Sequence, residues 1–104
     1  MTRCLLTVAL LSAIPLAKAD DRQIVLGRSL VEANCSRCHA VTSSDRSPHP
    51  DAPAFRLLSR RYPMETLAEA LAEGISTGHP DMPEFVASPA QIDAIIAYIG
   101  SINP

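Results

Sequence analysis

Apolar residues in this chain recur at helical spacing, and no segment shows the apolar–polar alternation of a half-buried strand. A first helix is predicted to begin at Asp20 or Asp21, either of which can cap it, and to run towards Asn34. The apolar positions of this helix lie three and four residues apart and are Ile24, Gly27, Leu30 and Val31. The pattern therefore predicts a helical domain with one glycine on the buried face of its first helix.

Two further helices are predicted after a polar loop, residues 43–53, that contains three prolines. A short helix begins near Phe55 and ends near Tyr62. The next helix has Pro63 at its favoured first position, and Gly74 is expected just past its last turn.

The last helix follows a second Pro-containing loop, residues 76–87. Ser88 and Gln91 have the spacing of a capping box, and Pro89 stands at the first helical position. An apolar stripe predicts that one side of this helix lies in the core, and it consists of Ile92, Ile95, Ile96, Ile99 and Ile102.

The segment Cys35-Ser36-Arg37-Cys38-His39 is a C-x-x-C-H motif, which is the attachment sequence for c-type haem. On a helix the two cysteines face the same side, where both thiols can bond to one porphyrin, and the histidine can reach its iron. A redox dithiol and a zinc site are the alternatives. Zinc would need two further ligands close by, whereas His49 and His79 are single and distant, and a thioredoxin-like motif would need alternating strands.

The N-terminus has the pattern of a secretory signal peptide. Arg3 precedes an apolar stretch, and Ala17-Lys18-Ala19 fits a cleavage site, so residues 1–19 are expected to be removed and residues 20–104 to form the domain. The alternative is an uncleaved anchor, but the apolar run of residues 4–17 falls short of the roughly 20 residues of a spanning helix. We expect a periplasmic protein with no membrane span in its mature form and with Cys4 removed.

Size and charge limit the remaining functions. Cleavage would leave 85 of the 104 residues, enough for one small domain that would need a staple such as haem. The loss of Arg3 and Lys18 would take the formal charge from −2 to −4 and leave no lysine. This excludes a basic surface for nucleic acid, and it favours a monomer whose protein partners dock through a basic or apolar face.

These features together resemble the class I monohaem cytochromes c. The residues that carry the resemblance stand in the family's order and are Gly27, Cys35 to His39, Pro53, Met82-Pro83 and Tyr98. The resemblance implies an all-α cytochrome c fold, in which three to five short helices wrap around one covalently attached haem c. Val31 departs from the pattern, because many members have an aromatic residue beside the helix crossing. The absence of a lysine ring is the second departure.

The resemblance also implies roles for individual residues. Cys35 and Cys38 would form the thioethers, and His39 would bind the iron. The carbonyl of Pro53 would accept a hydrogen bond from the imidazole of that histidine, which fixes its tautomer. Met82 would be the distal iron ligand, and Gly27 and Tyr98 would meet where the terminal helices cross.

Other side chains compete for the distal position. His79 precedes Met82 by three residues, His49 lies in the first Pro-rich loop, and Met64 stands at a helix start. The Met-Pro context and the preference of such centres for Met/His ligation favour Met82.

The haem propionates need donors. Arg60 and Tyr62 are predicted to contact the haem, and Arg56 and Arg61 are the neighbouring candidates, because guanidinium groups pair well with carboxylates. A solvated helix face is the alternative for each arginine.

The function that follows is a soluble periplasmic electron carrier, which passes single electrons between redox partner proteins and is not an enzyme. Two alternatives stay open. One is a haem subunit of a dehydrogenase complex. The other is a haem-based peroxidase or gas-binding protein, which would require a labile bond between Met82 and the iron.

Overall fold

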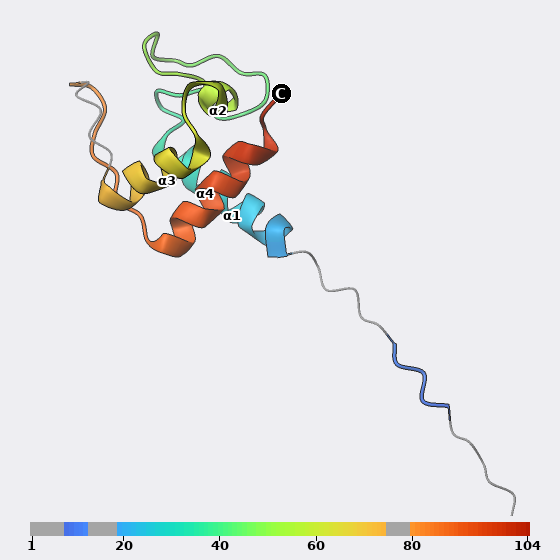
Figure 1. Ribbon diagram of the computed structural model, residues 1–104. Helices are drawn as coiled ribbons and strands as arrows, with labels where there is room; N and C mark the ends of the chain where they lie inside the picture. Colours follow the sequence, from blue (N-terminus) through green and yellow to red (C-terminus); the bar gives the residue numbers. More distant parts are fainter. Residues whose placement is uncertain (1–7, 13–18, 75–79) are drawn as a thin grey trace, which may run out of the picture.

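The computed structural model describes residues 8–12, 19–74 and 80–104 (Figure 1). Within these residues the chain forms four α-helices, one short 3-10 turn and no strand, which confirms the all-α prediction. The elements in order are α1 (Ala19–Asn34), η1 (Phe55–Leu57), α2 (Leu58–Arg61), α3 (Met64–Glu73) and α4 (Pro89–Ser101). Most of the predicted signal segment, including Cys4, lies outside the described residues, and so does His79.

Helices α1 and α4 cross and make the main helix–helix contact of the fold (Figure 1). Gly27 lies at the crossing. A Cβ atom on this residue would lie 1.9 Å from the backbone oxygen of Ala94 and 2.8 Å from Cβ of Tyr98. Glycine is required here because any side chain would push the two helices apart. The predicted contact between Gly27 and Tyr98 is therefore confirmed.

Helix α4 supplies the largest share of the core. The predicted capping box is present, because Ser88 Oγ accepts from the Gln91 amide and Gln91 Oε1 accepts from the Ser88 amide. The isoleucine stripe faces inwards, with Ile92, Ile95 and Ile99 buried. Burying each such side chain contributes roughly 1.5–3 kcal/mol, so the stripe is a main source of stability.

Two helix starts differ from the sequence-based predictions. Helix α1 begins at Ala19, so Asp20 and Asp21 lie within its first turn rather than at the position before it. Pro63 has a ψ of 139° and is the N-cap of α3 rather than its first residue, while its carbonyl accepts from the amides of Thr66 and Leu67. The predicted end of α3 is confirmed, because Gly74 follows it with φ of +83°, a conformation that favours glycine.

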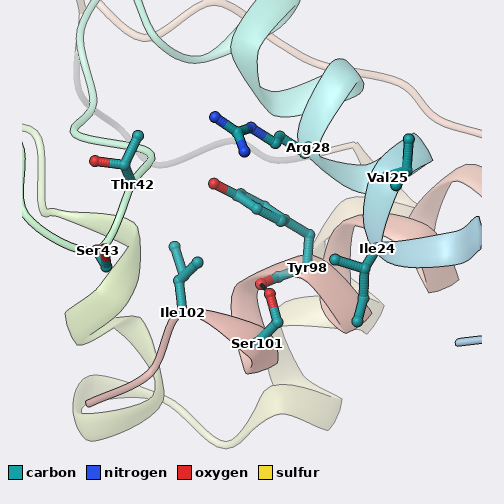
Figure 2. A pocket seen from close by; sticks show the side chains of 8 residues that line it. All are labelled: Ile24, Val25, Arg28, Thr42, Ser43, Tyr98, Ser101 and Ile102. Atoms are coloured by element: carbon teal, nitrogen blue, oxygen red, sulfur yellow. Dashed lines mark hydrogen bonds between the residues drawn. The ribbon is translucent and has the colours of Figure 1, made fainter. Parts of the chain in front are cut away.

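Tyr98 joins the helix crossing to the loop that follows the C-x-x-C-H motif. Its hydroxyl donates to the backbone carbonyl of Val41, and burial raises its pKa. Figure 2 shows the ring reaching from α4 towards Thr42, with Arg28 of α1 above it, in a cleft of about 350 Å³. Val31, where many related proteins have an aromatic residue, is fully buried in the same core.

Candidate cofactor site

A second, larger cavity of about 1220 Å³ lies between the helices and the two Pro-rich loops. Its apolar wall comes from η1, α2, α3 and α4 and includes Phe55, Leu58, Leu67, Leu71, Ile95 and Ile99. Small-molecule sites usually measure roughly 300–1,000 Å³, and protein interiors are otherwise closely packed. A hollow of this size and lining fits a large apolar group.

The C-x-x-C-H segment forms one side of this cavity. Backbone bonds from the Cys35 amide to Val31 and from the His39 amide to Cys35 continue the helical path of α1 beyond its last residue. Cys35, Cys38 and His39 all line the cavity. The helical turn therefore brings both sulfur atoms and the imidazole to the same space, as the spacing predicts.

The raised pKa of the Cys35 thiol argues against a catalytic dithiol. Burial raises the pKa of its thiol to about 11, so the group is protonated at neutral pH. Reactive cysteines of redox motifs have a lowered pKa instead. In the described part of the chain, moreover, no group of three or more potential ligands from His, Cys, Asp and Glu could hold a metal ion. The raised pKa of Cys35 gives no support to the redox-dithiol alternative.

His39 is oriented by a hydrogen bond across the following loop. Its Nδ1 lies 2.8 Å from the carbonyl oxygen of Pro53. Because a carbonyl can only accept, Nδ1 is the nitrogen that donates in this contact. The ring also packs against Phe55, with ring centroids 4.9 Å apart. The hydrogen bond thus fixes the orientation of the imidazole and leaves Nε2 as the nitrogen that can bind a metal.

Met82 lies in the loop that precedes α4, is half-buried, and lines the cavity together with Pro80, Asp81 and Pro83. The competing Met64 packs against the core and is not among the cavity-lining residues. His49 does line the cavity, but its Nε2 lies 3.2 Å from Asp81 Oδ2.

The two residues predicted to meet the propionates have different positions. Tyr62 lines the cavity and is about half exposed, whereas Arg60 is exposed and is not among the lining residues. Arg61 and Arg37 line the cavity instead. The sequence-based prediction did not include Arg37. Its place between the two cysteines of the motif could have indicated that it lies beside the cavity.

Comparisons with known proteins agree with this site. Residues 22–99 match the family model described as "Cytochrome C oxidase, cbb3-type, subunit III". This chain belongs to that family of c-type cytochromes. The cytochrome is also 35% identical over 78 residues to cytochrome c-552 of Bradyrhizobium diazoefficiens, an alignment that covers 75% of this chain and 73% of the relative. No solved structure matches significantly.

Membership of the family settles the cofactor and the general role. The cofactor is a covalently bound haem c with its iron, and the cytochrome is an electron carrier that must exchange electrons with redox partners. Proteins of this family are generally not enzymes and are typically periplasmic or extracytoplasmic. Within the described residues, no helix is long and apolar enough to cross a membrane.

Proposed function

We propose that this cytochrome is a periplasmic carrier of single electrons whose haem is attached at Cys35 and Cys38 and ligated by His39 and Met82. One observation carries the proposal. The residues of the C-x-x-C-H motif line a large, mainly apolar cavity. Met82, from a loop more than 40 residues later in the chain, lines the same cavity. This arrangement supports the proposal, because two thiols, an imidazole and a thioether would all be available to one group in the cavity.

Each residue has a separate part in this proposal. The bound haem supplies the one-electron chemistry. His39 would bind the iron through Nε2, while the Pro53 carbonyl holds the proton on Nδ1. Met82 would supply the second protein ligand, and ligation by a thioether together with histidine would raise the reduction potential and keep other ligands from the iron. Arg61, Tyr62 and Arg37 are the cavity-lining donors available to the propionates.

The charge near the cavity mouth favours a particular partner. Asp51, Asp81 and Glu84 line the cavity and are exposed, and no lysine follows the predicted cleavage site. A donor or acceptor with a basic docking face would be attracted to this acidic edge. Redox encounters of this kind bury little surface and are short-lived.

The decisive experiment is an optical and mass analysis of the protein purified from a bacterium that matures c-type haem. We expect one haem mass added to a chain that begins at Asp20, and a weak far-red band in the oxidised spectrum from the sulfur–iron bond. A haem-free chain with two alkylatable thiols would refute the attachment, and retention of residues 1–19 in membranes would refute cleavage.

The description of the matching family model favours a second candidate, a haem subunit held permanently in an oxidase. A lasting subunit needs an apolar contact surface, and Val25 and Leu26 on α1 are exposed. Gel filtration of native extracts separates the two candidates. A free carrier elutes as a monomer smaller than the 11.1 kDa uncleaved chain, whereas a subunit elutes with the complex. A haem-based peroxidase or gas-binding protein would instead lack the far-red band and bind added ligands in its native state.

A further inference from the structure

The loop that carries Pro53 is fixed by contacts that the proposed function does not explain. Residues 41–54 form no regular helix, yet they must bring the Pro53 carbonyl to His39. The two ends of this loop are joined, because the Phe55 amide donates to the Ala40 carbonyl at 2.9 Å. The Ala40 amide in turn donates to Ser47 Oγ at 2.9 Å.

Asp45 organises the first turn of the loop. Its carboxylate accepts from the Val41 amide at 3.1 Å, from the Thr42 amide at 2.9 Å and from Thr42 Oγ1 at 2.7 Å. Partial burial raises the pKa of Asp45, but the bonds from Thr42 and Val41 outweigh this and hold the pKa below its ordinary value. The carboxylate is therefore charged at neutral pH and can accept all three bonds.

Arg56 connects this turn to the segment that contains Pro53. Its Nη1 donates to the backbone carbonyl of Asp45 at 2.6 Å and lies 3.8 Å from Oδ1 of the same residue. The Arg56 side chain is only 25% exposed. Since Arg56 follows Pro53 by only three residues, a contact that holds Arg56 restricts where the Pro53 carbonyl can lie.

We infer that Asp45 and Arg56 act as positioning residues, which hold the Pro53 carbonyl against His39 Nδ1 and thereby tune how strongly His39 donates to the iron. This inference rests on the proposed role of His39 as the proximal ligand. A tight hydrogen bond to Nδ1–H makes imidazole a stronger donor and stabilises the oxidised iron. Loosening the pair therefore weakens donation and raises the reduction potential.

The test uses the mature holoprotein with Asp45→Ala and Arg56→Ala. Arg46→Ala is the matched control for Arg56→Ala, because Arg46 is an exposed arginine of the same loop and its loss changes the charge by the same amount and sign. Arg56→Lys keeps one cationic donor and should restore most of the wild-type behaviour. The readouts are the midpoint potential and the NMR exchange rate of the His39 Nδ1 proton.

We expect both alanine variants to raise the potential and to speed Nδ1 proton exchange by about tenfold or more, as loss of a charge-assisted hydrogen bond would do. Arg46→Ala should match the wild type. If the alanine variants lower the melting temperature but leave both readouts at the Arg46→Ala values, or lower the potential, the inference is wrong. Should Asp45→Ala fail to mature, Arg56→Ala compared with Arg56→Lys decides the question.

Failure of the underlying proposal has a different signature. A wild-type protein without covalent haem, or without His39 on the iron, refutes the proposed function before any variant is compared. A wild-type holoprotein with normal His39 ligation and unresponsive variants refutes only the role of Asp45 and Arg56.

Discussion

The crossing of α1 and α4 is held by side chains packed directly against backbone, whereas the loop of residues 41–54 is irregular chain held by hydrogen bonds. At the crossing, Gly27 leaves no room for one additional carbon atom. In the loop, Asp45 and Arg56 span 11 residues with polar contacts that solvent can partly reach. The first region sets whether the domain forms, and the second sets how one side chain is oriented.

Changing the crossing should therefore have the largest effect. Gly27→Leu places a side chain where even a Cβ would lie 1.9 Å from Ala94 O, so the helices must separate. We expect a loss of about 4 kcal/mol or more in the free energy of unfolding, and little covalent haem in the purified protein. Denaturant unfolding and the haem absorbance measure the two effects.

Gly100→Ala is the matched control for this change. A Cβ on Gly100 meets nothing within 4 Å, and the residue lies in α4. Alanine should stabilise the helix by up to about 1 kcal/mol. Equal damage from both substitutions would show that close approach at Gly27 is not what holds the crossing.

The second largest effect is expected at Met82, which lies in the loop before α4 and lines the same cavity as the loop of residues 41–54. Met82→Ala removes the proposed sulfur ligand and should abolish the far-red band, lower the potential and open the iron to added ligands. Optical titration with a small exogenous ligand measures the opening. Met64→Leu, which also removes a methionine but from the core, should retain the band, because the swap nearly conserves volume.

His79→Ala completes this test. If that variant loses the far-red band and Met82→Ala keeps it, the assignment of the distal ligand is wrong and the carrier becomes a low-potential or sensing protein.

A smaller effect is expected where the two regions meet. Tyr98→Phe removes the hydroxyl that donates to Val41 and should reduce the free energy of unfolding by about 1–3 kcal/mol, because a buried carbonyl loses its partner. Burial raises the pKa of Tyr98 above its ordinary value near 10. The folded protein therefore holds this proton to higher pH than the unfolded chain does, and stability falls as pH rises above 10.

This pH dependence gives the test for Tyr98. Tyr98→Phe should unfold with a weaker dependence on pH above 10 than the wild type, as followed by thermal melts. An unchanged alkaline slope would mean that another group causes it.

The comparison also explains what the sequence could predict. The cap of α4, the isoleucine stripe and the geometry of Cys35, Cys38 and His39 depend on residues within one or two helical turns, so local spacing was sufficient. Whether Arg60 or Arg61 lines the cavity depends on how α2 is rotated about its axis relative to helices that are distant in the sequence. The contact of Arg56 with Asp45 depends on the path of an irregular loop, which hydrophobic periodicity does not encode.

The smallest effect is expected at the start of α4, which belongs to the packed region but is exposed. Ser88→Ala removes the side-chain acceptor of the Gln91 amide and should cost about 1 kcal/mol. The matched control is Ser29→Ala in α1, because Ser29 Oγ donates to the Val25 carbonyl within the helix, where alanine is neutral or favourable. Urea unfolding of the two holoproteins compares their free energies of unfolding.

The haem spectrum should be unchanged in both variants, since neither serine lines the cavity. A spectral change in Ser88→Ala would mean that the start of α4 also controls the position of Met82, and the division between packed crossing and polar loop would then be too simple.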